Sequence, residues 1–131
     1  MLMSNVGFSA DIPVGPSEMY TDISSALAVA GTGDRILVEP GTYTESLSID
    51  SDIELIGTCG STVTTIEAVP GGTEVILINA SASVQGFGLD GQATARGIAI
   101  SQGAVILDDL VFMDTGSIQG SSIEIRSGAT V

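Results

Sequence analysis

The sequence of 131 residues contains no histidine, no lysine and no tryptophan, and it has one cysteine, Cys59. Without histidine, no Ser-His or Cys-His nucleophile pair can form, and no histidine can bind zinc or act as a general base near neutral pH. A single cysteine excludes a disulfide framework and a cysteine-based metal site within one chain. We expect Cys59 to pack as a small apolar side chain.

Positive charge is equally scarce. The chain has 16 acidic residues and three arginines, Arg35, Arg96 and Arg126, and its net charge at pH 7 is −13. Nucleic acids and anionic membrane surfaces are bound through clustered lysine and arginine, so this composition argues against both partners. No apolar run reaches the ~18 residues that a membrane-spanning helix needs. We expect the three arginines to pair with acidic residues at the surface.

Short apolar runs and small residues are abundant. Hydrophobic residues make up 44% of the chain, which also has 17 glycines, and its length suits one domain. The opening "MLMSNVGFSADIP" has an apolar head, but it lacks the basic region and the full hydrophobic region of a signal peptide. We interpret residues 1–15 as an N-terminal extension or a signal remnant. Residues 16–131 then form a single domain, extracellular or displayed at the cell surface.

One segment, "PSEMYTDISSALAVAGTGD", has the periodicity of a helix. Its apolar residues at helical spacing are Met19, Ile23, Ala26, Leu27 and Ala30. We predict a helix over about residues 21–30, with Thr21 as the N-cap and Gly31 ending it. So short a helix needs a partner to pack against.

From residue 34 onward, short runs rich in β-branched residues follow one another and repeat. One series consists of the isoleucine pairs Ile76/Ile78, Ile98/Ile100 and Ile123/Ile125. A second series aligns Val84, Phe87 and Leu89 with Leu107, Leu110 and Phe112, and Val131 falls where the next member belongs. The period is about 22 to 25 residues, and a strand-only repeat of this length predicts a solenoid.

The predicted fold is therefore all-β, a parallel β-helix in which each coil hydrogen-bonds to the previous one about 4.8 Å away. Equivalent isoleucines stack along the axis and form an apolar ladder. The helix over residues 21–30 covers the N-terminal end, where backbone groups and core side chains would otherwise meet water.

The segment from Tyr20 to Thr58 resembles the N-terminal entry of the right-handed parallel β-helices of the pectin-lyase-like superfamily. In that family a capping helix, a "GD-x-I-x-V-x-P-G-x-Y" segment and an "I-x-L-x-G" strand follow in this order. The matching residues are Gly33, Asp34, Ile36, Val38, Pro40, Gly41, Tyr43, Ile53, Leu55 and Gly57. The resemblance implies a right-handed parallel β-helix. It implies no single activity, because the superfamily includes lyases, esterases, adhesins and phage tailspikes.

The enzymatic branches of that superfamily carry their chemistry in later motifs. The region "VQGFGLDGQATARGIAISQGAVILDDLVF" lacks the "AQD"-type motif and the second catalytic segment of the pectin methylesterases. Pectate lyases need a calcium-binding acid cluster with arginine or lysine, and this chain has no lysine and no basic cluster. We expect no catalytic residues here. The alternative is the N-terminal portion of a polysaccharide-active enzyme whose catalytic coils are not in this chain.

Aspartates supply the candidate ligand sites. Asp90 and Asp114 end equivalent strands of neighbouring coils and could share a Ca²⁺ ion, which takes roughly six to eight oxygen ligands. Alternatively, both are turn residues that cap their own backbone. Asp108 and Asp109 are a candidate catalytic acid pair, but adjacent strand residues face opposite sides, so their carboxylates need not converge. They also align with Gln85 and Gly86 and build no acid ladder, so we interpret them as a solvated bend. We expect Asn79 to face the interior or to lie at a bend. Apart from calcium at Asp90 and Asp114, the sequence indicates no cofactor.

The C-terminal end of the predicted solenoid has no capping helix. An uncovered parallel edge recruits other chains, so we predict an assembly interface at Ile123, Ile125 and Val131. The expected role is non-catalytic, structural or adhesive, with copies stacking head to tail into filaments or other homo-oligomers. A polysaccharide-binding groove along the solenoid is a further alternative, which the scarcity of aromatic residues disfavours.

Overall fold

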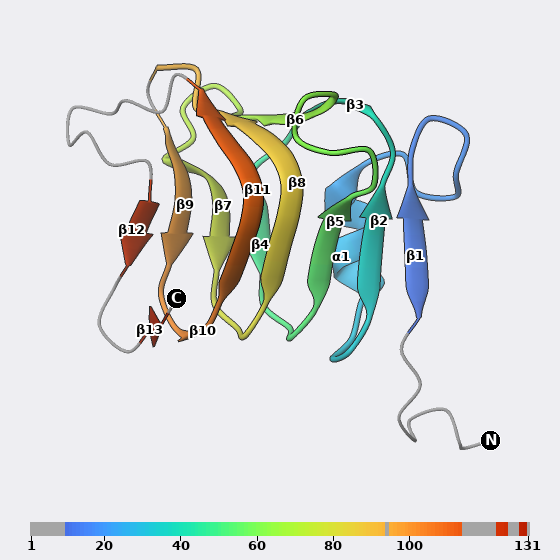
Figure 1. Ribbon diagram of the computed structural model, residues 1–131, viewed down its shortest axis with the longest axis horizontal. Helices are drawn as coiled ribbons and strands as arrows, with labels where there is room; N and C mark the ends of the chain where they lie inside the picture. Colours follow the sequence, from blue (N-terminus) through green and yellow to red (C-terminus); the bar gives the residue numbers. More distant parts are fainter. Residues whose placement is uncertain (1–9, 94, 114–122, 126–128, 131) are drawn as a thin grey trace.

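The computed structural model describes residues 10–93, 95–113, 123–125 and 129–130. The chain forms a parallel β-helix of about five turns with one short helix at its N-terminal end (Figure 1). The predicted all-β solenoid fold is confirmed. Within the described ranges, no helix is long and apolar enough to cross a membrane.

Two parallel sheets run along the solenoid axis. The seven-stranded sheet contains β1 (Asp11–Val14), β2 (Arg35–Val38), β3 (Gly41–Thr44), β5 (Glu54–Gly57), β6 (Thr64–Glu67), β8 (Ser83–Asp90) and β11 (Ile106–Met113). The four-stranded sheet contains β4 (Leu47–Ile49), β7 (Glu74–Ile78), β9 (Arg96–Ile100) and β12 (Ile123–Ile125). A third, two-stranded sheet pairs β10 (Gly103–Ala104) with β13 (Ala129–Thr130).

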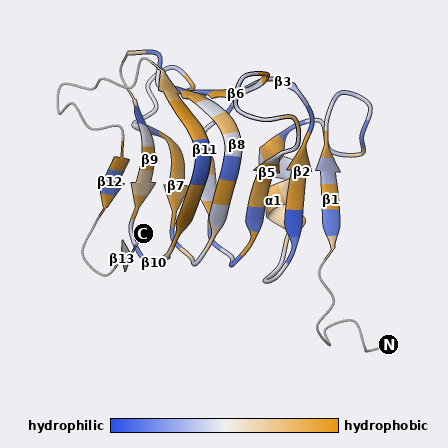
Figure 2. Cartoon of the chain, viewed as in Figure 1, coloured by the Kyte–Doolittle hydropathy of each residue, from blue (hydrophilic) through white to orange (hydrophobic). Residues whose placement is uncertain are grey.

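The coils stack in the register that the sequence repeat predicts. In the four-stranded sheet Ile76 pairs with Ile98, which in turn pairs with Ile123. In the seven-stranded sheet Phe87 pairs with Leu110. Alternate side chains point into the solenoid, and Figure 2 shows the resulting alternation of apolar and polar residues along the strands. The predicted apolar ladder is confirmed as the core of the fold.

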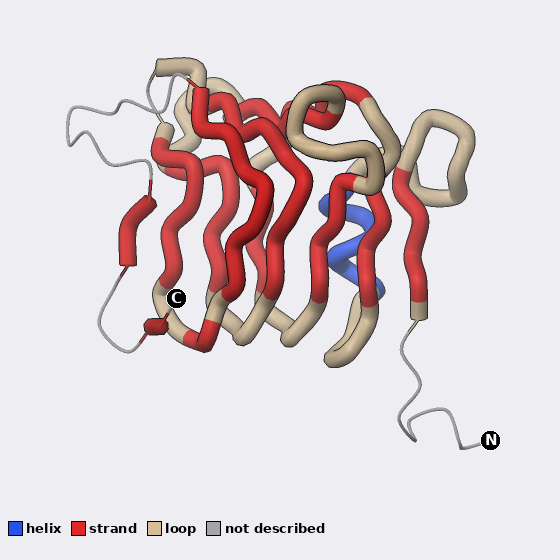
Figure 3. Tube along the Cα trace, viewed as in Figure 1, coloured by secondary structure: helices blue, strands red, loops and turns tan. Residues whose placement is uncertain are grey.

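Strand β8 pairs with two shorter strands of the preceding coil, β5 and β6. Residues 58–63 connect β5 to β6 and leave the sheet as a loop (Figure 3). Opposite this loop β8 passes through Gly86, whose φ of 84° is readily adopted by glycine. Cys59 lies on the loop and is exposed. The expectation that Cys59 packs as an apolar side chain is therefore wrong, because the loop has no core to pack into.

The helix α1 (Ile23–Val29) is shorter than predicted. Its N-cap is Asp22 rather than Thr21, since the Asp22 carboxylate accepts a hydrogen bond from the Ser25 N–H at 2.8 Å. It ends at Val29, and its C-cap is Ala30, one residue before the predicted Gly31. Ile23 and Ala26 are buried as predicted, and Leu27 and Ala30 pack partly against the core. Met19 lies outside the helix and is 84% exposed, so its assignment to the helical face is wrong.

Glu45, which precedes β4, supplies a second cap for α1. Its carboxylate accepts hydrogen bonds from the Ile23 N–H at 2.7 Å, the Ser24 N–H at 2.8 Å and the Ser24 hydroxyl at 2.6 Å. The first N–H groups of a helix have no partner within the helix, and a carboxylate there also interacts favourably with the helix dipole. Glu45 therefore fastens the capping helix to the first coil.

We expect Glu45→Ala to lower the free energy of unfolding by about 1–2 kcal/mol, because two backbone N–H groups of α1 lose their partner. Urea unfolding followed by circular dichroism measures the change. Glu54→Ala is the matched control: it removes the same charge from an exposed strand position, and we expect a change within about 0.5 kcal/mol. Equal losses in the two variants would contradict a capping role for Glu45.

Residues 11–14 belong to the solenoid, although the sequence assigned them to an N-terminal extension. They form β1, which pairs with β2 in parallel, and Ile12 and Val14 are buried. This short segment has only two alternating apolar residues, Ile12 and Val14, which are too few to predict a strand from the sequence. The solenoid begins one strand earlier than predicted, before the helix rather than after it.

Candidate functional site

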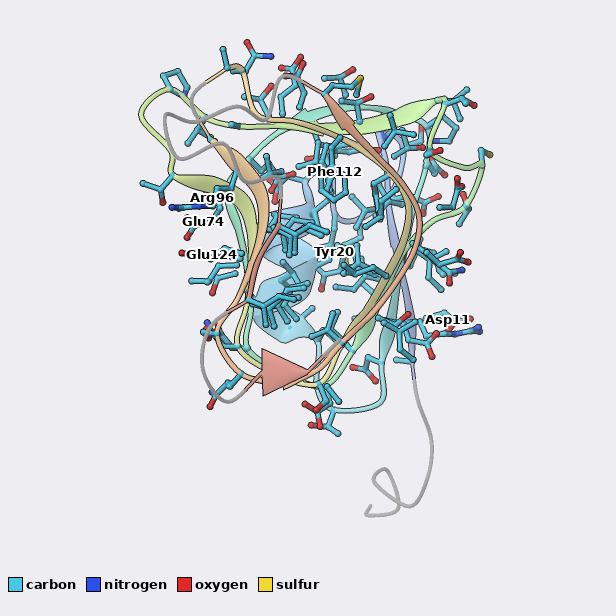
Figure 4. All side chains as sticks on the ribbon, turned by 60° about the vertical axis from the view of Figure 1, so that its left-hand side comes forward. Asp11, Tyr20, Glu74, Arg96, Phe112 and Glu124 are labelled. Carbon is cyan, nitrogen blue, oxygen red and sulfur yellow. The ribbon has the colours of Figure 1, made fainter. Side chains whose placement is uncertain are left out.

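The last coil exposes apolar side chains on the inner side of β11. Leu107, Leu110 and Phe112 continue the ladder of β8, but they are only partly buried, whereas their β8 partners are 0% exposed. Figure 4 shows Phe112 on the inner side of the coil. Among the described strands, none pairs with β11 on the side away from β8.

The outer side of β11 carries three exposed apolar side chains in addition to the exposed Asp108 and Asp109. Ile106 is 68% exposed and Val111 and Met113 are also exposed. Their partners on the neighbouring strand β8 are polar or small: Ser83, Gly88 and Asp90. Three outward positions thus change from polar or small residues on β8 to apolar residues on β11, while Asp108 keeps the row of Gln85 polar.

The backbone of β11 offers hydrogen-bonding groups at the open edge. The Ile106 N–H donates to the Ala82 carbonyl, and the Met113 carbonyl accepts from the Gly91 N–H, so Ile106 and Met113 direct their groups toward β8. Backbone groups alternate in direction along a strand. Leu107, Leu110 and Phe112 therefore direct their N–H and carbonyl groups away from β8.

The four-stranded sheet ends at the same end of the molecule, in β12 (Figure 1). Two predicted interface residues, Ile123 and Ile125, lie on β12 and are exposed, Ile125 by 54%. The third, Val131, lies outside the described residues. The structure thus brings Ile123 and Ile125 to the same open end as β11, and it adds the whole of β11 to the surface that the sequence suggested.

At the N-terminal end of the described solenoid the edge strand is β1. The Ala10 carbonyl accepts from the Arg35 N–H and the Val14 carbonyl from the Glu39 N–H, so Asp11 and Pro13 direct their backbone groups to the outer side of β1. Pro13 has no N–H, a feature that limits pairing at an edge. The Gly15 N–H, at the end of β1, donates to the Tyr20 carbonyl at 3.0 Å.

Two arginines pair with carboxylates as predicted. The Arg35 guanidinium donates to both Asp11 carboxylate oxygens at 2.9 Å, across the β1–β2 pair. The second pair is loose: Arg96 Nη2 lies 3.8 Å from Glu124 Oε2, on the outer side of the four-stranded sheet (Figure 4). Arg126 lies outside the described residues.

The predicted calcium pair is only half described, because Asp114 lies outside the described residues. Asp90 accepts a hydrogen bond from the Gln92 N–H two residues on, the contact of a turn residue that caps its own backbone. Its strand neighbours are Glu67 on β6 and Met113 on β11. In the described part of the chain, no group of three or more acidic or cysteine side chains is placed to hold a metal ion. Calcium binding stays a prediction.

Asp108 and Asp109 do form a bend. Asp108 stacks on Gln85 as predicted, while Asp109 leaves the pairing with a φ of 48°. The Asp109 carboxylate accepts from the Ser61 N–H at 3.2 Å and from the Ser61 hydroxyl at 2.8 Å. Asp109 therefore ties the loop of residues 58–63 to the last coil. No pattern in the sequence predicts this contact, which joins residues 48 positions apart.

Asn79 belongs to a polar stack at the corner that follows the four-stranded sheet. Its side-chain N–H donates to Asp50 at 2.8 Å, and its side-chain oxygen accepts from the Ser101 hydroxyl. Gln102 donates to the Asn79 carbonyl at 2.9 Å. Three successive coils are joined here by different residue types, so a search for repeated asparagines could not find the stack.

The alternative of a polysaccharide groove can be examined at the surface depressions of the described residues. A shallow depression of about 240 Å³ lies at the corner before the seven-stranded sheet, lined by acidic and small residues including Asp34, Asp52, Glu54 and Ser81. No aromatic side chain is among its described lining residues. Sugar rings bind mostly against aromatic faces, so the depression does not favour this alternative.

Backbone and carboxyl partners shift the pKa of three side chains near the N-terminal end. The Gly31 and Ala10 N–H groups lower the pKa of Asp34, so the stability that this carboxylate contributes is lost as the pH falls through its folded pKa. Glu39 is the opposite case, since a hydrogen bond with Glu18 raises its pKa. The stability from that pair is present at low pH and lost as the pH rises through the folded pKa. A hydrogen bond from Ser25 lowers the pKa of Asp22.

Comparison of the chain with models of protein families, with curated proteins and with solved structures finds no match. The parallel β-helix is shown by the structure, and the resemblance of its entry to the pectin-lyase-like superfamily stays a prediction.

Proposed function

We propose that this protein is a non-catalytic structural module, exported from the cell, whose C-terminal coil is an assembly surface for a second copy of the chain. The observation that carries the proposal is the exposure of apolar side chains on both faces of β11. Contiguous exposed apolar surface marks interaction sites in soluble proteins. An open parallel edge with free backbone groups adds the hydrogen bonds of strand pairing.

Charge sets the conditions for this association. Each chain carries a formal charge of −13, so two copies repel one another at low ionic strength. The screening length falls from ~30 Å at 0.01 M salt to ~10 Å at 0.1 M. We expect the fraction of associated chains to rise with sodium chloride concentration, since screening removes repulsion while apolar burial remains.

Light scattering with size-exclusion chromatography, together with negative-stain microscopy, tests the proposal. We expect oligomers in moderate salt. For Leu110→Lys we expect the dissociation constant of the oligomer to rise by about tenfold or more, because the substitution places a charge in the contact. Val63→Lys is the matched control, as Val63 is also exposed but lies on the loop of residues 58–63. A wild-type chain that stays monomeric at every salt concentration would overturn self-association.

The second candidate is the N-terminal portion of a polysaccharide-active β-helix enzyme. The "GD-x-I-x-V-x-P-G-x-Y" match from Gly33 to Tyr43 favours it, and in the structure these residues do form the first coil with β2 and β3. This candidate requires further coils with clustered Asp, Arg and Lys. A parent polypeptide with such coils, or cleavage of a uronate polymer by the chain, would favour the enzyme over the structural module.

A further inference from the structure

We propose that β1 is an acid-releasable strand whose start is fastened to the first coil by the ionised carboxylate of Asp34. Protonation of that carboxylate frees the strand while the rest of the solenoid stays folded. This release concerns the N-terminal end of the described solenoid and does not depend on the proposed assembly at the C-terminal coil. It follows from the small number of groups that hold β1 and from the chemistry of one of them.

β1 is held by fewer contacts than the inner strands. It lies at one edge of the seven-stranded sheet (Figure 1), and among the named strands it pairs with β2 alone. Its four residues bury two apolar side chains, Ile12 and Val14. β5 has the same length but pairs with β2 on one side and with β8 on the other. Segments with few buried contacts open locally at a lower free energy than the core, so β1 can detach before the coils unfold.

The Asp34 carboxylate joins the start of β1 to the turn between α1 and β2. One oxygen accepts a hydrogen bond from the Ala10 N–H at 2.9 Å, and the other accepts one from the Gly31 N–H at 2.8 Å. Ala10 directly precedes β1, and its carbonyl accepts from the Arg35 N–H at 2.8 Å. Asp34 therefore fixes the backbone at the point where the pairing of β1 with β2 begins.

This contact depends on the charge of Asp34. The Gly31 and Ala10 N–H groups lower the pKa of the Asp34 carboxyl, because both hydrogen bonds favour its ionised form. Hydrogen bonds to an ionised group are stronger than those between neutral groups. The stabilisation of the β1 start is therefore complete above the ordinary pKa of an aspartate, and it is lost as the pH falls through the lowered pKa of Asp34 in the folded chain.

The charged groups around Asp34 do not replace it as the acid-sensitive contact. Asp52 and Glu54 line the same depression as Asp34 and add negative charge beside it. The Arg35 guanidinium donates to Asp11 on β1, but both side chains of that pair are 46% exposed. Exposed ion pairs contribute little to stability and are screened by salt, so we assign the acid sensitivity to Asp34.

The other end of β1 responds to pH in the opposite sense. The Glu39 carboxyl lies against Gly15, directly after β1, and a hydrogen bond with Glu18 raises the pKa of Glu39. Acid therefore strengthens the hold at this end. We accordingly expect release to begin at Ala10 and to proceed toward Val14.

Hydrogen exchange of single backbone amides, followed by nuclear magnetic resonance, tests the release. The Arg35 N–H reports on the start of β1, and the Ser101 N–H, which donates to the Ile78 carbonyl at 2.9 Å, reports on an inner pair of coils. The pH is lowered from about 6 to about 3, across the range in which aspartates titrate. We expect the protection factor of the Arg35 N–H to fall by about tenfold, while that of the Ser101 N–H stays constant. Parallel falls at both amides would mean global unfolding, and constant protection at Arg35 would mean that β1 stays attached; either result would overturn the proposal.

Neutral variants identify the carboxylate that is responsible. Asp34→Asn keeps the size of the side chain but removes its charge. We expect its Arg35 N–H to show at neutral pH the low protection that the wild type shows in acid, with little further change as the pH falls. Asp52→Asn is the matched control, because Asp52 also accepts a backbone N–H across coils, that of Ser81 at 2.9 Å, but joins later coils rather than β1. We expect the control to keep the wild-type pH profile. A wild-type profile in Asp34→Asn, or loss of the profile in Asp52→Asn, would assign the acid response to another group and overturn the role of Asp34.

Discussion

Replacing Gly86 with alanine is expected to lower the free energy of unfolding by about 3 kcal/mol or more, enough to unfold a marginally stable domain. The added Cβ would overlap the carbonyl oxygen of Gly57 on the neighbouring coil. That oxygen belongs to the backbone of β5 and cannot move without separating the coils. A φ of 84° adds strain for any residue with a Cβ.

Gly71→Ala is the matched control for this substitution. Gly71 has almost the same φ, 82°, but an added Cβ there would meet no atom within 4 Å. We expect it to cost about 1 kcal/mol, which measures the backbone strain alone. Urea midpoints of the two variants give the difference, and yield of soluble protein serves if Gly86→Ala does not fold. Equal stability of the two variants would show that close packing of the coils at Gly86 contributes nothing.

Truncating Phe87 to alanine is expected to cost about 3–5 kcal/mol. Phe87 is 0% exposed and is among the largest fully buried side chains of the described core. It pairs with Leu110 of the next coil, and its ring lies close to Gly57 of the preceding one. The cavity would therefore persist, and thermal and urea unfolding would both report the loss.

Two further substitutions serve as controls for Phe87→Ala. Phe87→Leu keeps most of the volume, and we expect it to cost about 1.5 kcal/mol. Val111→Ala shortens an exposed side chain on the last coil and is expected to change stability by less than about 0.5 kcal/mol in the monomer. A small effect of Phe87→Ala would mean that the interior of the solenoid tolerates a cavity, contrary to the dense packing of protein cores.

Much of the architecture could be predicted because a solenoid repeats local information. The isoleucines at positions 76, 98 and 123 were aligned by their spacing, and they pair in that register. A one-residue shift would turn every inward side chain outward, so the apolar pattern fixes the register strongly. The capping helix was found for the same reason, since its apolar face has a clear period.

The site was predicted less completely. Ile123 and Ile125 were assigned to an assembly surface from the absence of a cap, and the structure exposes both. The exposed apolar side chains of Ile106, Val111 and Met113 were missed, because the alignment followed only the inward residues Leu107, Leu110 and Phe112. The bend at Asp109 lies between Leu107 and Leu110, and the contact that it makes with Ser61 could not be read from spacing.

By itself, the sequence determined the class of fold, the period of the coils, the residues of the apolar ladder and the exclusion of histidine-based chemistry. These depend on composition and on spacing along the chain. Only the tertiary structure decided which groups meet across coils, such as Glu45 on α1 and Asp109 on Ser61. Such contacts depend on how far each coil turns and where it bends, and the chain fixes those quantities only when all of the coils pack together.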